Sequence, residues 1–405
     1  MKKIWFFNFT DPLPSTNNKF LRRHESLALD LSNKGYDVTW VTDSFSHTQK
    51  IHFVGDSFHP RLKIIKLSSI GYSRNISLRR ILHNIFLSIS VFSLMIRTPK
   101  RLKPEIAMIS FPPIEPSFVL GILSKIFGIK FLIDFRDLHP DIFYNVFKSI
   151  LMKALMSIAL IPYRLMVFCI LHLSNQTFTT SPDVSNFLKH KYRLKQLPKS
   201  FYHWYKSENN LQENHNDQSF QLKIKEYIYS VSDPVVLSYC GALSRRLDFM
   251  NLVKAFKRLE DSSKILVLCG SGDQLEEIKQ QASSCKNIFV APNIPREGVS
   301  AIYNLSDYGL LPYPPDIDFQ LAPPTKLSEM LSHNLKIICS ENTYVHKNLK
   351  DKITSYYYKF NDFNSLIEVI RQIQKVDETD TINKDFWSRN LNYPISSAMS
   401  DEIAP

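Results

Sequence analysis

Residues 106–135 read IAMISFPPIEPSFVLGILSKIFGIKFLIDF, and this stretch decides the fold class. Its two continuous apolar runs, Ile106–Phe111 and Ile129–Phe135, are typical of buried strands, and residues 117–127 between them have helical spacing. A strand, a helix and a second strand in this order indicate a parallel sheet, because the crossover helix returns the chain to the same end of the sheet.

The same alternation continues on both sides of this stretch. Towards the N-terminus we expect strands at Ile4–Phe9 and Val38–Thr42, with a helix over Phe20–Lys34 between them. A strand at Gln176–Thr180 closes the first series, and the polar segment 198–232 indicates a linker with a domain edge. A second series follows, with strands expected at Val235–Tyr239, Lys264–Cys269, Asn287–Ala291, Tyr308–Leu311 and Lys336–Ser340, and helices at Met250–Leu259, Gln274–Ala282, Val299–Leu305, Lys326–Ser332 and Phe363–Lys375.

Two such series predict an α/β protein with two doubly wound Rossmann-like domains that face each other across a cleft. The predicted N-terminal domain spans residues 1–200, and the predicted C-terminal domain spans residues 201–376. We expect the tail, residues 377–405, to return to the N-terminal domain. Ligands should bind at the carboxyl ends of the strands.

Charge divides the chain into two unlike halves. Residues 1–200 contain 28 lysines and arginines against 12 acidic residues, whereas residues 201–405 contain 22 against 26. The basic half indicates a phosphate, nucleic-acid or anionic membrane partner. The five cysteines show no metal-ligand spacing, and the first apolar run is too short for a signal peptide, so we expect reduced cysteines in a cytosolic protein.

Two apolar stretches, Ile81–Ile96 and Ile150–Leu173, lie within runs of the basic half that lack any acidic residue. Neither is an uninterrupted apolar span of about 20 residues. They are either core helices or helices lying in an anionic membrane surface, and the coincidence with basic runs favours membrane contact for at least one.

The stretch APPTKLSE, Ala322–Glu329, predicts a ligand site at a helix start. Lys326 would lie in the first turn, where the helix dipole already disfavours a cation, so a bound phosphate would resolve the conflict. Glu329, one turn later, could accept hydrogen bonds from a ribose diol. The alternative is an ordinary amphipathic helix with solvated charges.

Other candidate residues follow the predicted strands. DFRDLHPD, Asp134–Asp141, indicates acid–base chemistry or a salt-bridged loop. CGALSRR places Gly241 where a backbone can approach closely, and Arg245 or Arg246 could bind a diphosphate. The alternative is that the two arginines are a plain basic pair on the surface. Gly270–Gly272 is half of a dinucleotide fingerprint, and the DxD pattern at Asp316 is short enough to arise by chance.

Several of these segments together resemble the GT-B glycosyltransferases of family 4, in the bacterial surface-polysaccharide branch (capsule and O-antigen). The resemblance runs from Ile4 to about Lys350 and includes HESLALDLSNKGYDVTWVTD, SFPP, DFRDLHPD, YCGAL, LCGSGD, APNIP, SDYGLLP and PPTKLSEMLSHNLKII. It implies a retaining transfer of a hexosyl or N-acetylhexosaminyl group from a nucleotide diphosphate, without a metal ion or other cofactor. The nucleotide that we expect in the donor is UDP.

The resemblance also implies roles for individual residues. The catalytic residues would be Asp137 and His139, and the acceptor side would include Arg136, His24 and His47. The donor would contact the residues Gly241, Arg245, Arg246, Asn293, Thr325, Lys326 and Glu329. The acceptor would be a polyprenyl-diphosphate-linked saccharide at the inner face of the cytoplasmic membrane, with no nucleic-acid partner.

Three departures from the family pattern stand out. The loop TDPLPSTNN after the first strand lacks glycine, Leu321 replaces the first of two paired glutamates, and Asn334 with Leu335 replaces a glycine turn. They leave open a less active enzyme or a catalytically weak scaffold. A sugar-nucleotide epimerase of the same architecture is another alternative, and a nucleic-acid-binding protein is disfavoured because no recognition module is evident.

Overall fold

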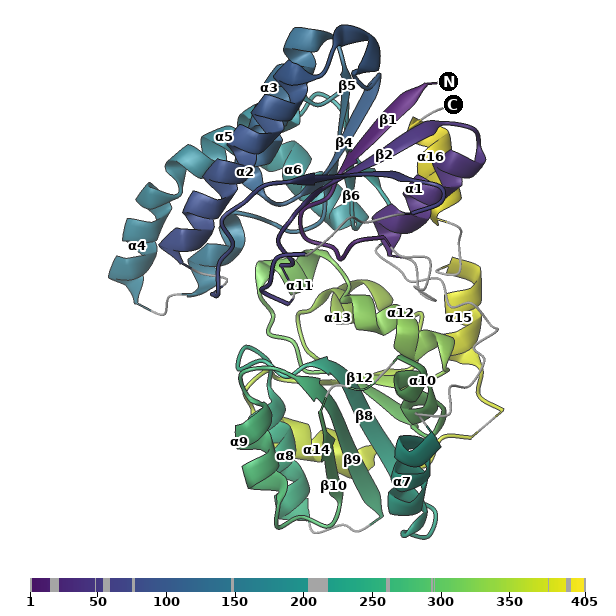
Figure 1. Ribbon diagram of the computed structural model, residues 1–405. Helices are drawn as coiled ribbons and strands as arrows, with labels where there is room; N and C mark the ends of the chain where they lie inside the picture. Colours follow the sequence, from purple (N-terminus) through teal and green to yellow (C-terminus); the bar gives the residue numbers. More distant parts are fainter. Residues whose placement is uncertain are drawn as a thin grey trace. The chain divides into compact units, whose positions relative to one another are not determined.

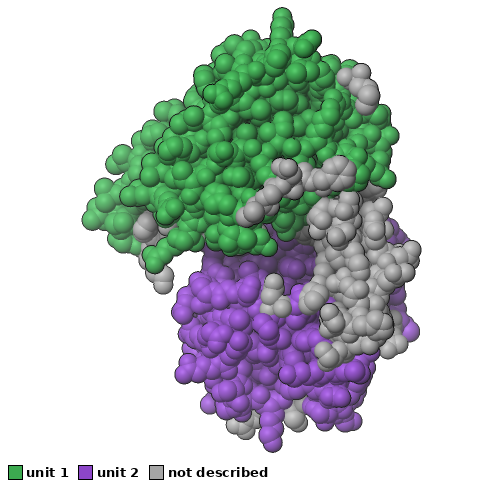
Figure 2. Space-filling view, viewed as in Figure 1, with its two compact units in different colours: residues 1–206, 394–405 green, residues 207–393 purple. Residues whose placement is uncertain are grey.

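The computed structural model describes residues 2–14, 22–47, 49–53, 59–74, 77–146, 149–202, 218–259, 263–292, 294, 296–377, 379–390 and 395–403. The chain divides into two compact units, drawn in green and purple in Figure 2. Unit 1 comprises residues 1–206 and 394–405, and unit 2 comprises residues 207–393. Each unit is an α/β domain built on one parallel sheet.

Unit 1 contains a seven-stranded sheet in the order β3-β2-β1-β4-β5-β6-β7. Its strands are β1 (Lys3–Phe7), β2 (Asp37–Asp43), β3 (Lys63–Leu67), β4 (Ile106–Phe111), β5 (Lys130–Phe135), β6 (Gln176–Thr179) and β7 (Lys199–Ser200). The strand order reverses between β1 and β4, which pair in parallel with Ile4 opposite Ile106. Ligands of such sheets bind at the carboxyl ends of the strands beside this reversal.

The helices of unit 1 cover both faces of its sheet (Figure 1). They are α1 (Arg23–Asn33), α2 (Leu78–Arg97), α3 (Ile114–Phe127), α4 (Ile150–Ala159), α5 (Ile161–Leu173), α6 (Pro182–Tyr192) and α16 (Ile395–Ile403), with short 3-10 turns at Lys100–Leu102 and Asp141–Val146. Met399 and Ile403 of α16 share a buried cluster with Leu27 of α1 and Phe6 of β1. On the other face, α3 packs against α2 and α5.

Unit 2 repeats this plan with six strands in the order β10-β9-β8-β11-β12-β13. Its strands are β8 (Val235–Ala242), β9 (Lys264–Ser271), β10 (Ile288–Ala291), β11 (Tyr308–Leu311), β12 (Lys336–Ser340) and β13 (Ser355–Tyr358). Its helices are α7 (Gln218–Tyr229), α8 (Phe249–Leu259), α9 (Leu275–Ala282), α10 (Arg296–Asn304), α11 (Ile317–Leu321), α12 (Thr325–Ser332), α13 (Tyr344–Leu349), α14 (Phe363–Gln372) and α15 (Ile382–Asn390). The strand order reverses between β8 and β11, so the expected binding edge lies after these strands.

The predicted fold class is confirmed, and the predicted bounds of β4, β11 and β12 agree with the structure. Within residues 198–232, predicted to hold a linker and a domain edge, the structure places β7 and α7. Ile224 and Ile228 of α7 are buried one turn apart and attach this otherwise polar helix to unit 2. The tail is divided: α15 contacts α12 in unit 2, and α16 contacts α1 in unit 1.

Asn334 explains one of the departures from the family pattern. It follows α12 with φ of +62°, a left-handed conformation that asparagine tolerates better than most residues other than glycine. Its side-chain oxygen accepts a 3.0 Å hydrogen bond from the Lys384 backbone N–H, and its amide group donates to the Asp380 carbonyl. The asparagine therefore makes the turn and holds the start of α15.

Candidate functional site

The glycines after β8 and β9 bring two backbones together in unit 2. The parallel ladder between these strands extends to the pair Gly241 and Gly270. A Cβ atom on Gly270 would lie 1.7 Å from the Gly241 carbonyl oxygen, and one on Gly272 would lie 2.1 Å from the Leu243 carbonyl oxygen. The GSG motif is thus required for packing at the binding edge, which is a role that the partial dinucleotide fingerprint did not indicate.

The start of α12 lies at the same edge. Thr325 is its first residue, and Pro324 precedes it without a side-chain cap. The Lys326 ammonium lies 3.0 Å from a Glu329 carboxylate oxygen, and both side chains are partly exposed. Burial raises the pKa of the Cys240 thiol well above its ordinary value, and the nearby charges of Lys326 and Glu329 also act on it. The structure therefore brings these two residues to the end of β8.

Arg245 is exposed and turns towards α9. Its backbone N–H donates a 3.0 Å hydrogen bond to Asp273, and its guanidinium lies 2.9 Å from the Glu277 carboxylate. In this structure Arg245 forms an exposed ion pair with α9, and its contact with a diphosphate stays a prediction. An exposed pair of this kind is weak, so an incoming diphosphate could displace the glutamate.

Arg246 connects the loop after β8 to α11. Its guanidinium lies 2.8 Å from Asp316 and 2.7 Å from Asp318, and it is stacked 4.9 Å from the centre of the Phe319 ring. Burial opposes its charge, but the two carboxylates outweigh this effect and raise the pKa of Arg246. The DxD pattern is therefore an arginine-binding pair that holds α11. Asn293, the remaining donor-side candidate, lies outside the described residues.

A buried ionic network lies below the candidate acceptor loop of unit 1. The Asp134 carboxylate accepts hydrogen bonds from Arg23 Nε (2.9 Å) and Nη2 (2.8 Å), and it lies 2.7 Å from His24 Nε2. Burial opposes its ionisation, yet Arg23 and His24 hold the pKa of Asp134 well below its ordinary value. His24 is 1% exposed. The expectation that His24 faces the acceptor is therefore wrong, because its ring is buried against Asp134, where it positions β5.

Arg136 continues the network towards the surface. Its Nη1 donates to Asp11 at 2.9 Å and to the Ser110 hydroxyl at 3.3 Å. Asn8 donates a 2.7 Å hydrogen bond to the same Asp11 carboxylate. Burial opposes the ionisation of Asp11, but the charges of Arg136, His24 and Arg22 and the Asn8 hydrogen bond together hold the pKa of Asp11 well below its usual range.

Asp11 belongs to the loop where the family pattern has glycine. Ionic bonds from Asp11 to Arg136 and Arg22 thus hold the described start of this loop. Sequence reasoning missed Asn8 and Asp11; the available signal was two polar residues directly after a buried strand at the β1–β4 reversal.

Asp137 is exposed, and His139 is half-buried in the same loop. Burial, with a contribution from the Arg80 charge, lowers the pKa of His139 to about 3, so its imidazole is neutral at physiological pH. The ring lies edge-on to Phe143 at 4.9 Å and lines a pocket of about 420 Å³. A neutral imidazole can donate or accept a hydrogen bond, but it cannot supply a positive charge.

Three residues, His47, Lys50 and Arg80, lie around the side chain of Tyr72, and we call these four residues the Tyr72 cluster. The Lys50 ammonium lies 4.4 Å from the ring centre, the Arg80 guanidinium lies 5.6 Å from it, and His47 Nδ1 is hydrogen-bonded to the Tyr72 hydroxyl. Burial and the charges of Lys50 and Arg80 lower the pKa of His47 to about 4. The cluster is therefore a basic surface next to Asp11, whose charge also acts on His47.

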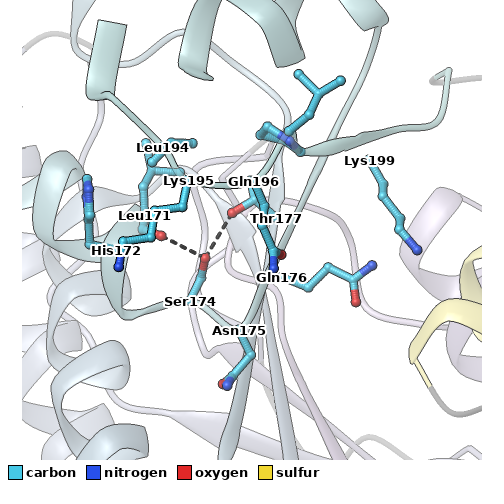
Figure 3. Close-up of a pocket in the computed structure, with 12 residues that line it drawn as sticks. Leu171, His172, Ser174, Asn175, Gln176, Thr177, Leu194, Lys195, Gln196 and Lys199 are labelled. Atoms are coloured by element: carbon cyan, nitrogen blue, oxygen red, sulfur yellow. Dashed lines mark hydrogen bonds between the residues drawn. The ribbon is translucent and has the colours of Figure 1, made fainter. Parts of the chain in front are cut away.

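A second pocket of unit 1, of about 530 Å³, lies between the start of β6 and the segment that precedes β7 (Figure 3). The Ser174 hydroxyl donates to the Leu171 carbonyl and is hydrogen-bonded to the Thr177 hydroxyl within one wall of the pocket, both at 2.9 Å. It contains none of the candidate residues and lies at the amino ends of the strands, away from the edge where such sheets bind ligands. We assign it no role in the reaction.

An apolar surface covers α2, α4 and α5. Large side chains that are 40% exposed or more include Leu82, Phe86, Ile89 and Phe92 of α2, Leu151, Leu155 and Ile158 of α4, and Leu165 and Phe168 of α5. By length and composition, α2 could cross a membrane, and α4 with α5 could do so as a pair bent by 46°. The opposite side of α2 is buried through His83, Leu87, Val91 and Met95, so α2 is a packed helix with an exposed apolar face.

Comparisons with known proteins identify relatives of the fold and of unit 2. Residues 221–382 match the family described as Glycosyl transferases group 1. No curated protein matches the chain.

Three solved structures illustrate the similarity in fold. Sucrose-phosphate synthase of Thermosynechococcus elongatus is 14% identical, covers 99% of this chain and 98% of its own, and has a TM-score of 0.69. Anabaena HepE in complex with UDP-glucose is 11% identical (100% and 98% covered, TM-score 0.64). WaaG, a glycosyltransferase involved in lipopolysaccharide biosynthesis, is 12% identical (99% of both chains, TM-score 0.63).

Proposed function

We propose that this chain, whose residues 221–382 match the group 1 glycosyltransferases and whose fold resembles theirs, is a retaining glycosyltransferase that uses a nucleotide sugar. We also propose its donor, its acceptor class and its location. The donor is a UDP sugar of the hexose or N-acetylhexosamine type, and the acceptor is a polyprenyl-diphosphate-linked saccharide. The reaction needs no metal ion. It takes place at the inner face of the bacterial cytoplasmic membrane, in the synthesis of a surface polysaccharide such as capsule or lipopolysaccharide O-antigen.

The start of α12 is the observation that carries the proposed donor site. Lys326 and Glu329 lie at the end of β8, within the segment that matches the family. Free N–H groups at a helix start and an adjacent ammonium favour a diphosphate. Glu329 then accepts the hydroxyls of the ribose. HepE has been solved with UDP-glucose, which makes UDP the first nucleotide to test.

The same groups would stabilise the transition state. Breaking the bond between sugar and phosphate leaves negative charge on the departing diphosphate and positive charge on the sugar. Lys326 and the uncapped start of α12 lie where the negative charge develops, and such preorganised groups supply several kcal/mol, about 3–4 for one well-placed donor. The Asp316 and Asp318 carboxylates are engaged by Arg246, so we assign them to loop structure and not to a metal.

In unit 1, the loop from Arg136 to His139 serves the acceptor and the reacting sugar. Asp137 is exposed and carries a carboxylate for an acceptor hydroxyl, and neutral His139 can orient a sugar hydroxyl. Arg136 holds the first loop through Asp11, and we assign it a positioning role.

The apolar surface of α2, α4 and α5 supports the proposed location. Soluble proteins rarely expose so many large apolar side chains on neighbouring helices, and such patches mark membrane or partner contacts. The residues around this surface are basic, since residues 57–104 and 142–182 contain no aspartate or glutamate. Apolar helices flanked by cations bind anionic bilayers. WaaG, of similar fold, is described as acting in lipopolysaccharide biosynthesis.

Calorimetric titration with UDP, GDP, ADP and their sugars, with and without Mg²⁺, tests the donor site. We expect binding of UDP that does not depend on Mg²⁺ and is lost in Glu329→Ala. The matched control is Glu368→Ala, an exposed glutamate on α14 of the same unit. Failure of every nucleotide to bind would refute the proposal.

Incubation with a UDP sugar then separates the alternatives. Transfer to a prenyl-diphosphate-linked saccharide supports the proposed reaction. Conversion of the sugar nucleotide without an acceptor would indicate an epimerase, and binding without turnover would indicate a scaffold. Flotation with phosphatidylglycerol vesicles at low salt tests the location, and no association would refute it.

A further inference from the structure

The pocket beside His139 lies between the binding edge of unit 1 and its exposed apolar helices. Its walls come from α2 (Leu78, Ile81), from α4 (Met156, Ala159) and from the loops that follow β4 and β5 (Pro113, His139). Its volume of about 420 Å³ falls in the range of roughly 300–1,000 Å³ that is usual for small-molecule pockets. One end is therefore formed by the candidate catalytic loop, and one wall by helices with apolar outer faces.

The apolar walls continue directly into the exposed surface. Leu78, which lines the pocket, is 80% exposed, and Ile158, next to the lining residue Ala159, is 66% exposed. A hydrocarbon chain could therefore extend from a bilayer along these exposed side chains of α2 and α4 into the pocket. This continuity favours a lipid occupant over a soluble sugar.

Two cationic side chains, Arg80 and Lys50, lie at or near the pocket wall. Arg80 is a lining residue, and its guanidinium shares the Tyr72 ring with the Lys50 ammonium. Burial lowers the pKa of Lys50, and the Arg80 charge lowers it further, which shows that the two like charges lie close enough to repel. An anion next to both would relieve this repulsion, and arginine with lysine is the usual pair for a phosphate.

Glu115 is the one carboxyl group among the described residues of the pocket wall. Glu115 accepts a 3.0 Å hydrogen bond from the Asn84 amide, and burial raises its pKa. Tyr163 of α5 also hydrogen-bonds to it. Glu115 thus ties α2, α3 and α5 together behind the pocket.

We infer that this pocket binds the first isoprene units of the lipid-linked acceptor, and that Lys50 and Arg80 bind the phosphates attached to them. The inference rests on the proposed function, because it assigns the place of the acceptor that the enzyme uses. The occupant is a prenyl diphosphate: the hydrocarbon lies between α2 and α4, and the charged group lies at the Tyr72 cluster. The attached saccharide then lies beside Asp137 and His139.

Binding of farnesyl diphosphate, measured by calorimetry with saturating UDP present, tests the inference. UDP occupies the donor site, so a diphosphate that binds there is excluded from the signal. Ala159→Trp fills the pocket from an exposed position, and Ala154→Trp, also exposed on α4, is its matched control. Arg80→Gln removes the cation, and Arg97→Gln on the same helix is its control.

We expect Ala159→Trp and Arg80→Gln each to weaken farnesyl diphosphate binding by about tenfold or more, and both controls to bind like the wild type. UDP binding and thermal unfolding should be the same in all five proteins. Farnesol should bind more weakly than farnesyl diphosphate, and inorganic pyrophosphate should bind more weakly still.

Three results would overturn the inference. Equal binding of farnesyl diphosphate by Ala159→Trp and Ala154→Trp would exclude the pocket as its binding site. Equal binding of farnesol and farnesyl diphosphate by the wild type would exclude the contact with the phosphates. If the wild-type enzyme binds UDP and transfers sugar but does not bind farnesyl diphosphate, both the hydrocarbon site and the phosphate site are excluded, and the proposed transferase function is unaffected. Loss of UDP binding itself would refute the proposed function.

Discussion

Replacing Arg23 with methionine should destabilise unit 1 by about 3–5 kcal/mol, because breaking a buried ion pair leaves an uncompensated charge. Asp134 is fully buried, and Arg23 donates two of the three hydrogen bonds described for its carboxylate. Arg23 also donates to the backbone carbonyls of Phe201 and Tyr202, so the same change loosens the start of the segment after β7. Methionine keeps an unbranched apolar side chain and removes the guanidinium with its charge and its donors.

The midpoint of thermal unfolding gives the simplest assay. For a domain of roughly 150–250 residues, each kcal/mol shifts the midpoint by about 2–4 °C, so the expected shift is about 6–20 °C. Urea unfolding should give the matching loss of free energy in the transition of unit 1, with little change in that of unit 2. The matched control is Arg22→Met, since Arg22 is 40% exposed and lies 3.4 Å from Asp11. A surface pair of this kind should cost less than about 1 kcal/mol.

The effect should depend on pH with a definite sign. In the wild type the pKa of Asp134 is held well below its ordinary value, so this stabilisation is present above about pH 4 and is lost only as pH falls through the folded-state pKa. In Arg23→Met, burial without the guanidinium raises that pKa, so the variant gains stability on acidification. The difference between the two proteins should therefore narrow towards about pH 4. Equal costs for the Arg22 and Arg23 variants, or a gap that widens in acid, would refute this account.

Three further predictions concern unit 2. Lys326→Ala should weaken UDP binding by about tenfold to a hundredfold, because a hydrogen bond to a charged group contributes about 1.5–3 kcal/mol; calorimetry measures this, and unchanged affinity would contradict it. Gly270→Ala should lower the free energy of unfolding by at least about 2 kcal/mol, because the new Cβ would lie 1.7 Å from the Gly241 carbonyl oxygen; a neutral effect in urea unfolding would exclude this packing. Burial raises the pKa of Asp248 to about 6, so the folded state binds its proton more tightly than the unfolded chain. Between about pH 4 and about pH 7, the free energy of unfolding of the wild type should therefore fall by about 3 kcal/mol relative to that of Asp248→Asn. The same pH dependence of stability in both proteins would exclude the raised pKa of Asp248.

The strands with continuous apolar sequence were predicted well, and the missed elements share a different composition. β4, β11 and β12 are buried on both faces and read as short apolar runs. β3 reads KIIKL, with partly exposed positions, and β13 reads SYYY. These two edge strands pair on one side only, so their sequences need not be apolar throughout, and pattern reasoning passed over them.

In the candidate site, too, the local arrangement was predicted from the sequence and the long-range contacts were not. Sequence spacing placed Lys326 and Glu329 one turn apart at a helix start, and the structure shows them 3.0 Å apart there. Spacing within one helix depends on local geometry alone, so it can be read from the chain. The partners of Arg246 and Asp134 lie 70 and 111 residues away in sequence, and no local pattern indicates them.

The amino-acid sequence by itself determined the α/β class, the two series of strands and helices, the charge difference between the halves, and the placing of Lys326 and Glu329 one turn apart at the start of α12. These properties follow from the periodicity of apolar residues and from local backbone chemistry. Only the tertiary structure decided that His24 is buried against Asp134, that the DxD carboxylates hold Arg246, that Asp11 pairs with Arg136, and that a pocket lies between His139 and the apolar helices. Each of these depends on which distant residue fills the space beside a charged group, because burying a charge is costly unless a partner of opposite charge lies beside it.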